Sequence, residues 1–304
     1  MNAIPTAPRR VEYAAPAAID TDRGHIPVYA TGVVAQPWEE YSADDHHTWG
    51  ALYTRQRELL VGRACDAFLQ AQDAMGMDAS AIPRFDQLNE ALSAATGWTL
   101  VGVEGLLPEL DFFGHLASRR FPVTWWIRRP EQIDYIAEPD LFHDLFGHVP
   151  LLMDPRFADY LEAYGHGGLK AHALGPEAMQ YLARLYWYTV EFGLIRQDDG
   201  LRIYGAGIVS SKGESLYSLE SQAPNRLGFD LERIMRTRYR IDTFQKTYFV
   251  IDSFEQLMRA TGADFTPIYA GLAGQAAVPA GTVLATDAVL HRGTGEGWAS
   301  GGDV

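Results

Sequence analysis

Residues 138–150 read EPDLFHDLFGHVP, a short apolar run that carries two histidines, two aspartates, a glycine and two prolines. Pro139 and Asp140 suit the first turn of a helix, because that turn has no partner for a backbone N–H and its dipole favours negative charge. The pattern therefore predicts a short helix that begins at Pro139 and carries the first histidine.

The two histidines of this stretch, His143 and His148, are five residues apart. On an unbroken α-helix this spacing is a rotation of about 500°, so the two side chains would point about 140° apart. Gly147 can adopt the left-handed conformation that ends a helix, and Pro150 cannot continue one. We therefore expect the chain to turn and to bring His148 back toward His143 as a second metal ligand.

The spacing by itself is weak support for a metal site. Nine histidines in 304 residues give about 0.3 such pairs by chance, so two satisfied core histidines are an equal explanation. A second stretch changes this balance.

Residues 179–195 read MQYLARLYWYTVEFGLI and contain one acidic residue, Glu191. Apolar and aromatic residues fall on nearly every face, so we expect one helix that is buried all round. A buried carboxylate costs several kcal/mol of desolvation unless it is protonated, paired or bound to a metal. Arg184 lies about 10 Å away along the helix axis, too far for direct pairing. A metal shared with the two histidines is therefore favoured over a protonated or water-bridged glutamate.

Two histidines and one carboxylate are the ligand set of non-haem iron(II) oxygenases, which keep open positions for water, dioxygen and a co-substrate. Zinc sites prefer a closed tetrahedron or a single open water position. A zinc hydrolase on the same ligands is an alternative, weakened because Asp144 is a short substitute for the usual general-base glutamate. A non-catalytic module that binds an aromatic ligand, with structural histidines, is another.

Composition places the chain among ordinary globular proteins: 304 residues, 47% of them hydrophobic, can bury a large core. The net charge of −14 argues against nucleic acid or an anionic membrane as a partner. A single cysteine, Cys65, excludes an intrachain disulfide and a thiolate metal cluster. Without a signal-like start or a long apolar stretch, a cytoplasmic location is expected.

Helical patterns outnumber strand patterns, which predicts a mainly α fold with a few short β-strands. We expect strands at 125–127, 201–204 and 247–251, a helix at 155–164 ended by glycines, and a capping box from Ser253 to Gln256. Arg128, at the end of the first of these strands, is either a fork for a carboxylate or a surface arginine. For domains we expect a poorly ordered leader (1–40), a catalytic domain (41–270) and a C-terminal surface tail (271–304).

Three stretches carry a resemblance to a known family: EPDLFHDLFGHVPLL (138–152), LYWYTVEFGL (185–194) and YGAGIVSS (204–211). In this order and spacing they closely resemble the pterin-dependent aromatic amino acid hydroxylases, above all the short bacterial members. The likeness covers roughly residues 45–270 and implies a single multihelical catalytic domain. Lacking the regulatory domain and the coiled-coil helix of the animal members, the chain is expected to be monomeric.

The resemblance implies an activity: hydroxylation of L-phenylalanine to L-tyrosine with dioxygen and tetrahydropterin at Fe(II), the first step of phenylalanine catabolism. Ile241 is apolar where tyrosine-hydroxylating relatives tend to carry an acid, which favours phenylalanine as the substrate. Tryptophan or tyrosine hydroxylation within the same family is the alternative.

The resemblance also implies roles for individual residues. His143, His148 and Glu191 match the iron ligands. Substrate positions are matched by five residues: Arg128, which holds the amino acid carboxylate, Asp140, Trp187, Gly207 and Ser210. Pterin positions are matched by six: Leu106, Leu107, Phe112, which stacks on the pterin ring, Asp144, Ala183 and Tyr186. Asp144 stands where animal members carry glutamate, and Pro122 replaces a histidine on the pterin side.

Overall fold

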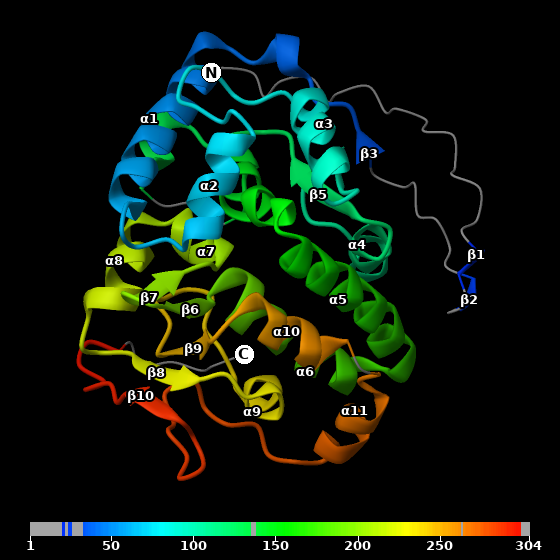
Figure 1. The fold of residues 1–304 in the computed structure, drawn as a ribbon, viewed down its shortest axis with the longest axis vertical. Helices are drawn as coiled ribbons and strands as arrows, with labels where there is room; N and C mark the ends of the chain where they lie inside the picture. Colours follow the sequence, from blue (N-terminus) through cyan, green and yellow to red (C-terminus); the bar gives the residue numbers. More distant parts are fainter. Residues whose placement is uncertain (1–19, 22–23, 26–32, 135–137, 263, 299–304) are drawn as a thin grey trace. The chain divides into compact units, whose positions relative to one another are not determined.

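The computed structural model describes residues 20–21, 24–25, 33–134, 138–262 and 264–298 (Figure 1). Most of the expected leader lies outside these residues. The described chain is mainly helical with short strands, which confirms the predicted fold class. It divides into two compact units, one formed by Met1–Arg55 with Ala71–Leu169 and the other by Gln56–Gln70 with Lys170–Val304.

The α-helices of the described residues are α1 (Ala43–Leu60), α2 (Asp66–Ala74), α3 (Phe85–Ala95), α4 (Glu109–Leu116), α5 (Pro155–Leu174), α6 (Pro176–Tyr186), α7 (Ala206–Val209), α8 (Lys212–Glu220), α9 (Leu231–Arg236), α10 (Phe254–Thr261) and α11 (Thr266–Leu272). Five short helical segments of other types are η1 (Trp38–Glu40), η2 (Pro130–Gln132), η3 (His143–His148), η4 (Val149–Met153) and η5 (Trp187–Glu191), among the described residues. The strands are β1 (Asp20–Thr21), β2 (Gly24–His25), β3 (Val33–Val34), β4 (Thr99–Val103), β5 (Arg120–Thr124), β6 (Leu194–Gln197), β7 (Gly200–Ile203), β8 (Asn225–Gly228), β9 (Thr247–Ile251) and β10 (Val289–His291).

The first unit is built on a three-stranded sheet in the order β3-β4-β5. β4 and β5 are parallel and are joined by α4, while β3 pairs antiparallel with β4. α3 packs on β4, and both α4 and η3 pack on β5. Because Phe113 and Leu116 of α4 are buried, this helix closes one part of the hydrophobic core.

Two glycines of α5, Gly165 and Gly168, let this helix lie directly against α4. A Cβ on Gly168 would be 2.1 Å from the Phe113 ring, and one on Gly165 would be 2.4 Å from the Ala117 nitrogen. The prediction that these glycines end the helix at 164 was therefore wrong. Each glycine costs about 1 kcal/mol of helix propensity, which the close packing offsets.

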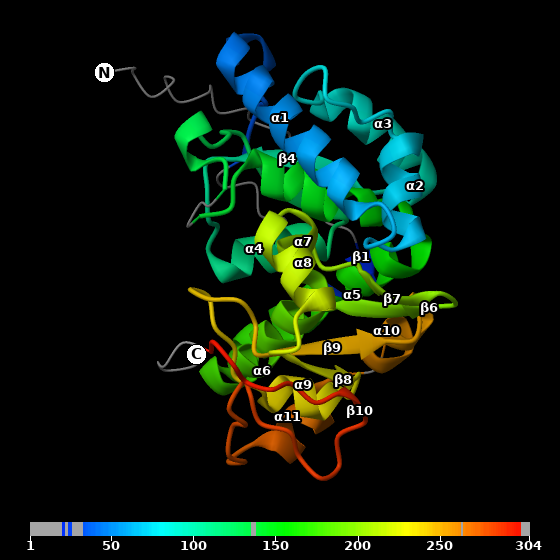
Figure 2. The same cartoon turned by 90° about the vertical axis from the view of Figure 1, so that its left-hand side faces the viewer.

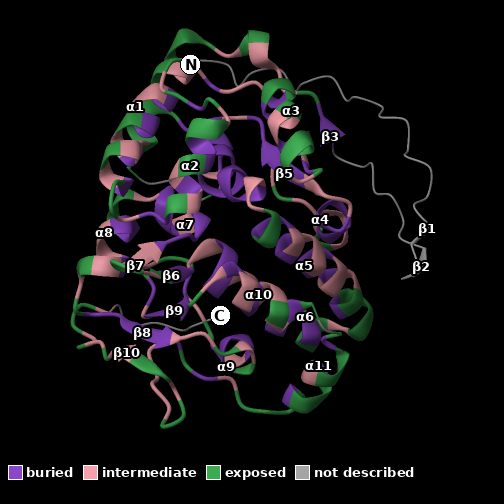
Figure 3. Cartoon of the chain, viewed as in Figure 1, coloured by how far each residue is buried: buried purple, intermediate pink, exposed green. Residues whose placement is uncertain are grey.

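The second unit contains a five-stranded sheet in the order β10-β8-β9-β6-β7, with β9 in the centre (Figure 2). β8 and β9 are almost wholly buried, as their purple colour in Figure 3 shows. The predicted strand at 247–251 is confirmed, and β7 covers most of the strand predicted at 201–204. Ser253 is the N-cap of α10, since its side chain accepts the Gln256 N–H, but the predicted capping box is incomplete, because the Gln256 side chain accepts the Asp252 N–H at 2.8 Å.

The strand predicted at 125–127 was wrong: β5 ends at Thr124, one residue earlier. Trp125 and Ile127 are nevertheless buried, so their apolar, β-favouring side chains reflect burial in an irregular segment. Strand propensity and core burial use the same residue types, and the pattern does not separate them.

The proposed domain limits stay a prediction, but ordered strands occur on both sides of 41–270. In the expected leader, Val33 and Val34 are buried and pair with β4. In the expected tail, β10 pairs with β8. A buried ion pair between Arg233 and Asp287, 2.9 Å apart, also fastens this tail to α9.

Candidate active site

The two histidines of the 138–150 stretch come together on a π-helix. Residues 143–148 form η3, in which Gly147 stays helical, and Pro150 lies in the following short helix η4. The expected stop at Gly147 was therefore wrong. In a π-helix the hydrogen bonds join residues five apart, so His148 comes to lie over His143 without any break. Such turns are rare and cluster at functional sites.

The other side of this helix fixes its rotation. Phe142 and Phe146 stack on each other at 4.8 Å, and they meet Trp49 and Tyr53 of α1 at 5.5 and 5.6 Å between ring centroids. With both phenylalanines fully buried, the helix cannot turn without opening the core.

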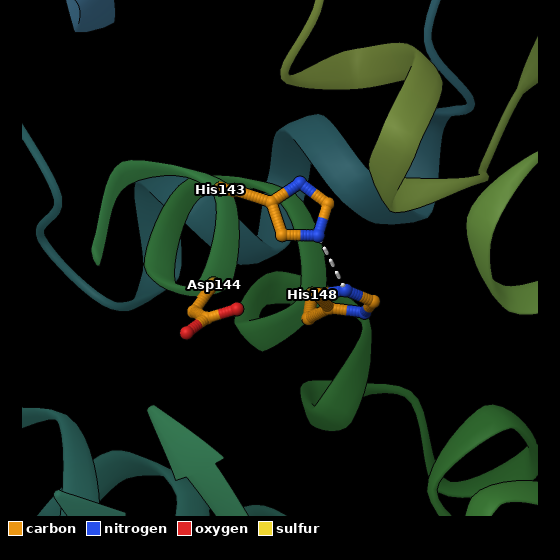
Figure 4. Close-up of side chains that lie close together, drawn as sticks. All are labelled: His143, Asp144 and His148. Carbon is orange, nitrogen blue, oxygen red and sulfur yellow. Dashed lines mark hydrogen bonds between the residues drawn. The ribbon is translucent and has the colours of Figure 1, made fainter. Parts of the chain in front are cut away.

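The imidazole rings converge at one point (Figure 4). His143 Nε2 and His148 Nε2 are 3.1 Å apart, and the ring planes are at 84° to each other. Two nitrogen ligands at about 2.1 Å from one metal ion, at right angles, would lie about 3 Å apart. The geometry fits a shared cation as well as it fits a direct hydrogen bond between the rings.

Asp144 is the third residue of a group in the first unit that could hold a metal ion. Candidate ligand atoms of Asp144, His143 and His148 all lie within 4.8 Å of one another. The Thr124 N–H donates to Asp144 Oδ2 at 2.7 Å. Burial raises the pKa of Asp144 to about 7, although His148 and the Thr124 N–H favour its charged form. Phe121 covers the His148 ring at 5.1 Å.

Arg128 and Asp140 form a buried, bidentate ion pair. Arg128 Nε donates to Asp140 Oδ2 and Arg128 Nη2 to Asp140 Oδ1, both at 2.8 Å. The same carboxylate accepts the backbone N–H of Arg128 at 2.9 Å and that of His143 at 3.0 Å. Asp140 therefore fixes the guanidinium of Arg128 and the start of η3 together, and the remaining guanidinium donors stay available for a ligand.

The other predicted pterin residues of the first unit lie before and within α4. Leu106 is 81% exposed and Leu107 is half-buried. Phe112 is half-buried, with its ring 5.6 Å from that of Phe113. A half-exposed ring held by a buried neighbour suits stacking on a flat ligand.

Glu191 ends a second π-helix, η5, which follows α6 directly. The single buried helix predicted for 179–195 was wrong: α6 ends at Tyr186, Gln180 is exposed, and Leu194 begins β6. Glu191 is half-buried, so its desolvation is smaller than the sequence suggested.

Gly207 packs against the Glu191 side chain. A Cβ on Gly207 would lie 3.2 Å from Glu191 Oε2 and 2.9 Å from the Phe192 ring. A Cβ on Gly205 would be 2.4 Å from the Glu191 carbonyl oxygen. The glycines of the YGAG segment are thus required by the close approach of this backbone to Glu191.

Trp187, at the start of η5, is held on several sides. Its ring stacks on Tyr239 at 4.3 Å and lies 4.7 Å from Phe192. Its Nε1–H donates to Gln245 Oε1 at 3.0 Å. Sequence reasoning missed Tyr239, Phe192 and Gln245, because residues that support a pocket residue carry no motif of their own.

The remaining predicted residues of the second unit lie on α6 and just after α7. Ala183 and Tyr186 are half-buried on α6. Ser210 is buried, and its hydroxyl donates to the Ala206 carbonyl at 2.7 Å.

Glu214 of α8 is a buried carboxyl that sequence reasoning missed. One carboxyl oxygen, Oε1, accepts hydrogen bonds from the Tyr248 hydroxyl and the Gln245 N–H. Burial raises the pKa of Glu214 from 4.5 to about 7, while these two bonds work in the opposite direction. Glu214, Tyr217 and Arg226 all act electrostatically on Tyr248.

This shift predicts a pH-dependent stability. Because the folded chain holds the proton more tightly than the unfolded chain, the Glu214 contribution is full below about pH 4.5 and is lost as the pH rises through about 7. The difference corresponds to about 3 kcal/mol of unfolding free energy. Glu214→Gln, which stays neutral, should lose less stability than the parent between about pH 5 and about pH 8 in urea unfolding. Equal losses for the two proteins would contradict the assignment.

Comparison with known proteins decides the family. A family model described as biopterin-dependent aromatic amino acid hydroxylase matches residues 27–265. The chain belongs to this family. The predicted resemblance and the predicted single multihelical catalytic domain of hydroxylase type are thereby confirmed.

Several phenylalanine-4-hydroxylases are similar to this chain over most of their length. The phenylalanine-4-hydroxylase of Ralstonia nicotianae is 64% identical over 269 residues, which are 88% of this chain and 85% of the relative. The phenylalanine-4-hydroxylase of Chromobacterium violaceum is 62% identical over 269 residues, which are 88% of this chain and 90% of the relative. The crystal structure of the C. violaceum phenylalanine hydroxylase with bound oxidised Fe(III) matches with a TM-score of 0.83 at 62% identity, over 85% of this chain and 93% of that chain.

A further crystal structure of the C. violaceum enzyme contains iron(III) and the oxidised cofactor 7,8-dihydrobiopterin. It matches this hydroxylase with a TM-score of 0.81 at 62% identity, over 85% of this chain and 92% of that chain. In the described part of the hydroxylase, no helix combines the length and the apolar character needed to cross a membrane.

Proposed function

We propose that this hydroxylase binds iron through His143, His148 and Glu191 and converts L-phenylalanine to L-tyrosine with dioxygen and tetrahydropterin. The single observation that carries the metal assignment is the 3.1 Å separation of the two imidazole Nε2 atoms. Iron and the pterin together activate dioxygen, and the protein supplies position and a dry environment.

Two carboxylates are candidates for the third ligand, and their chemistry favours Glu191 over Asp144. Asp144 already accepts the Thr124 N–H, and burial raises its pKa. Glu191 keeps a carboxylate oxygen within 3.2 Å of the position of a Gly207 Cβ, so its carboxylate lies against a backbone that has been left without a side chain.

The substrate is proposed to bind between a cation and an aromatic wall. Arg128, oriented by Asp140, holds the amino acid carboxylate, and Trp187 with Gly207 and Ser210 surrounds the ring. An apolar ring and a charged head group are thereby recognised by separate parts of the site.

The pterin is proposed to stack on Phe112, with Leu106, Leu107, Asp144, Ala183 and Tyr186 around it. The half-exposed Phe112 ring supports this role. The side chain of Asp144 is one carbon shorter than that of a glutamate. It therefore suits a pterin that lies close to η3.

A turnover assay tests the function. The chain loaded with Fe(II) and supplied with tetrahydropterin, dioxygen and L-phenylalanine should release tyrosine, and zinc in place of iron should release none. Hydroxylation of tryptophan or tyrosine in preference to phenylalanine would move the assignment within the family. Activity that requires zinc and no pterin would support a hydrolase.

Ile241 is 68% exposed, so its proposed part in substrate choice is tested by Ile241→Asp in the same assay.

Gly207→Ala should weaken iron binding. The added methyl group would lie 3.2 Å from Glu191 Oε2 and 2.9 Å from Phe192, so the carboxylate must shift. Displacing a metal ligand through its neighbour typically costs about 10- to 100-fold in metal affinity. Competition with an Fe(II) chelator measures this change.

Gly271→Ala is the matched control, because a Cβ there meets nothing within 4 Å and the helix α11 continues through it. It should leave iron affinity unchanged. Equal iron affinities for Gly207→Ala and the parent would show that Glu191 does not hold the metal from this position.

The setting of the reaction is proposed with it: a monomeric enzyme in the cytoplasm that begins phenylalanine breakdown and acts on small molecules, with neither nucleic acid nor a membrane as partner. The net charge of −14 supports the last point. Sedimentation at several protein concentrations would test the monomer.

A further inference from the structure

We propose that Gln245 is a positioning residue for substrate recognition, because its side chain fixes the orientation of the Trp187 indole ring. The proposal rests on the proposed function, in which Trp187 lines the site for the substrate ring. It adds a residue that acts on the substrate through another side chain.

The contact between the two side chains is specific. Trp187 Nε1–H donates to Gln245 Oε1 at 3.0 Å, and Gln245 is 2% exposed. The carboxamide is fixed at its other end, since Nε2 donates to the Arg240 carbonyl at 2.8 Å. Both partners of Nε2 are carbonyl oxygens, so the amide oxygen must face the indole.

The backbone of Gln245 is fixed as well. Its N–H donates to Glu214 Oε1 at 3.1 Å, and the same oxygen accepts the Tyr248 hydroxyl. Gln245 also lies just before β9, the central strand of the sheet. The acceptor for Trp187 is therefore supported by α8 and by β9, and it cannot follow the indole if the indole moves.

The stacking of Tyr239 on Trp187 restrains some motions of the indole more than others. Tyr239 stacks on the indole with an interplanar angle of 18°, which opposes tilting more than rotation within the ring plane. The hydrogen bond to Gln245 opposes that rotation, because it is directional. Without it, the edge that the indole presents to a substrate ring would vary.

Gln245→Met tests this role, since methionine has a similar length and no amide. The KM for L-phenylalanine should rise by roughly three- to tenfold, the range expected for one lost hydrogen bond. Fewer tyrosines should form per tetrahydropterin oxidised, while the bound iron stays at the parent level. Gln275→Met is the matched control: Gln275 is exposed and bonds only within its own helix end, so all three quantities should stay unchanged.

A double-mutant cycle separates positioning from general stability. Trp187→Phe removes the donor of this hydrogen bond and keeps an aromatic ring, and in that background Gln245→Met should add little to the KM. Additive effects of the two substitutions on KM would overturn the proposal.

A spectroscopic measurement is independent of turnover. The indole N–H resonance of Trp187, assigned as the one that Trp187→Phe removes, should move upfield in Gln245→Met because its acceptor is lost. An unchanged resonance would refute the contact itself. If the parent enzyme made no tyrosine but the resonance moved as expected, the proposed function would fail while the positioning contact would stand.

Discussion

His148→Ala is expected to purify with almost no iron and to form no tyrosine above background. The substitution removes one of two imidazole nitrogens that lie 3.1 Å apart, and a site with one histidine and one carboxylate binds Fe(II) weakly. Iron affinity should fall by more than about 100-fold, since even residues that only support metal ligands cost up to that factor. Metal analysis after dialysis, together with a tyrosine assay, measures both effects.

The control for this variant is His47→Ala. His47 is exposed on α1 and lies outside the metal-ligating group of the described residues, so this variant should keep its iron and its activity. Full iron content in His148→Ala would mean that the convergence of the two rings is structural. The alternative of two core histidines would then be restored.

Asp140→Ala is expected to lower the free energy of unfolding by about 3–5 kcal/mol, because it leaves the Arg128 guanidinium buried without its counter-charge. The side chains of Arg128 and Asp140 are 6% and 0% exposed, so water does not replace the lost partner. The KM for L-phenylalanine should also rise, because the Arg128 guanidinium would lose the carboxylate that orients it. Urea unfolding and steady-state kinetics measure the two effects.

Asp134→Ala is the comparison for this prediction. Asp134 pairs with Arg55 at 2.6 Å, but its side chain is 78% exposed, so its loss should cost no more than about 1 kcal/mol. Asp140→Asn keeps acceptor oxygen and shape, and it should fall between the parent and Asp140→Ala. A loss for Asp140→Ala as small as that for Asp134→Ala would contradict a stabilising role for the buried pair.

That His143 and His148 come together could be predicted from the sequence, but the way they meet could not. The prediction assumed an α-helix, for which His143 and His148 diverge, and it used Gly147 to repair the geometry. The chain instead forms a π-helix. The choice between the two helices depends on the burial of Phe142 and Phe146 against α1, which is a tertiary effect that no local pattern reveals.

Glycine was misinterpreted for a related reason. Gly165 and Gly168 look like a helix end, yet they serve the contact of α5 with Phe113 and Ala117. The sequence alone does not distinguish a glycine that ends a helix from a glycine that allows another helix to pack closely. Gly97, by contrast, has a φ of +77°, a conformation that favours glycine whatever its neighbours.

The burial of Glu191 was overestimated because its neighbours in sequence are apolar. The helix ends at Glu191 and β6 begins three residues later. The apolar neighbours of Glu191 in sequence therefore belong to a strand as well as to a helix. The support of Trp187 by Gln245, 58 residues later, had no signal at all. Contacts between side chains far apart in sequence are fixed by the fold, and they are where sequence reasoning ends.

The central claim is that one iron ion is held by two imidazoles and the carboxylate of Glu191. A crystal structure of the Fe(II)-loaded chain, with the metal located by its anomalous scattering, tests this most directly. The account predicts His143 Nε2, His148 Nε2 and a Glu191 carboxylate oxygen at bonding distance from a single ion. An ion bound by Asp144 with Glu191 pointing elsewhere would contradict it.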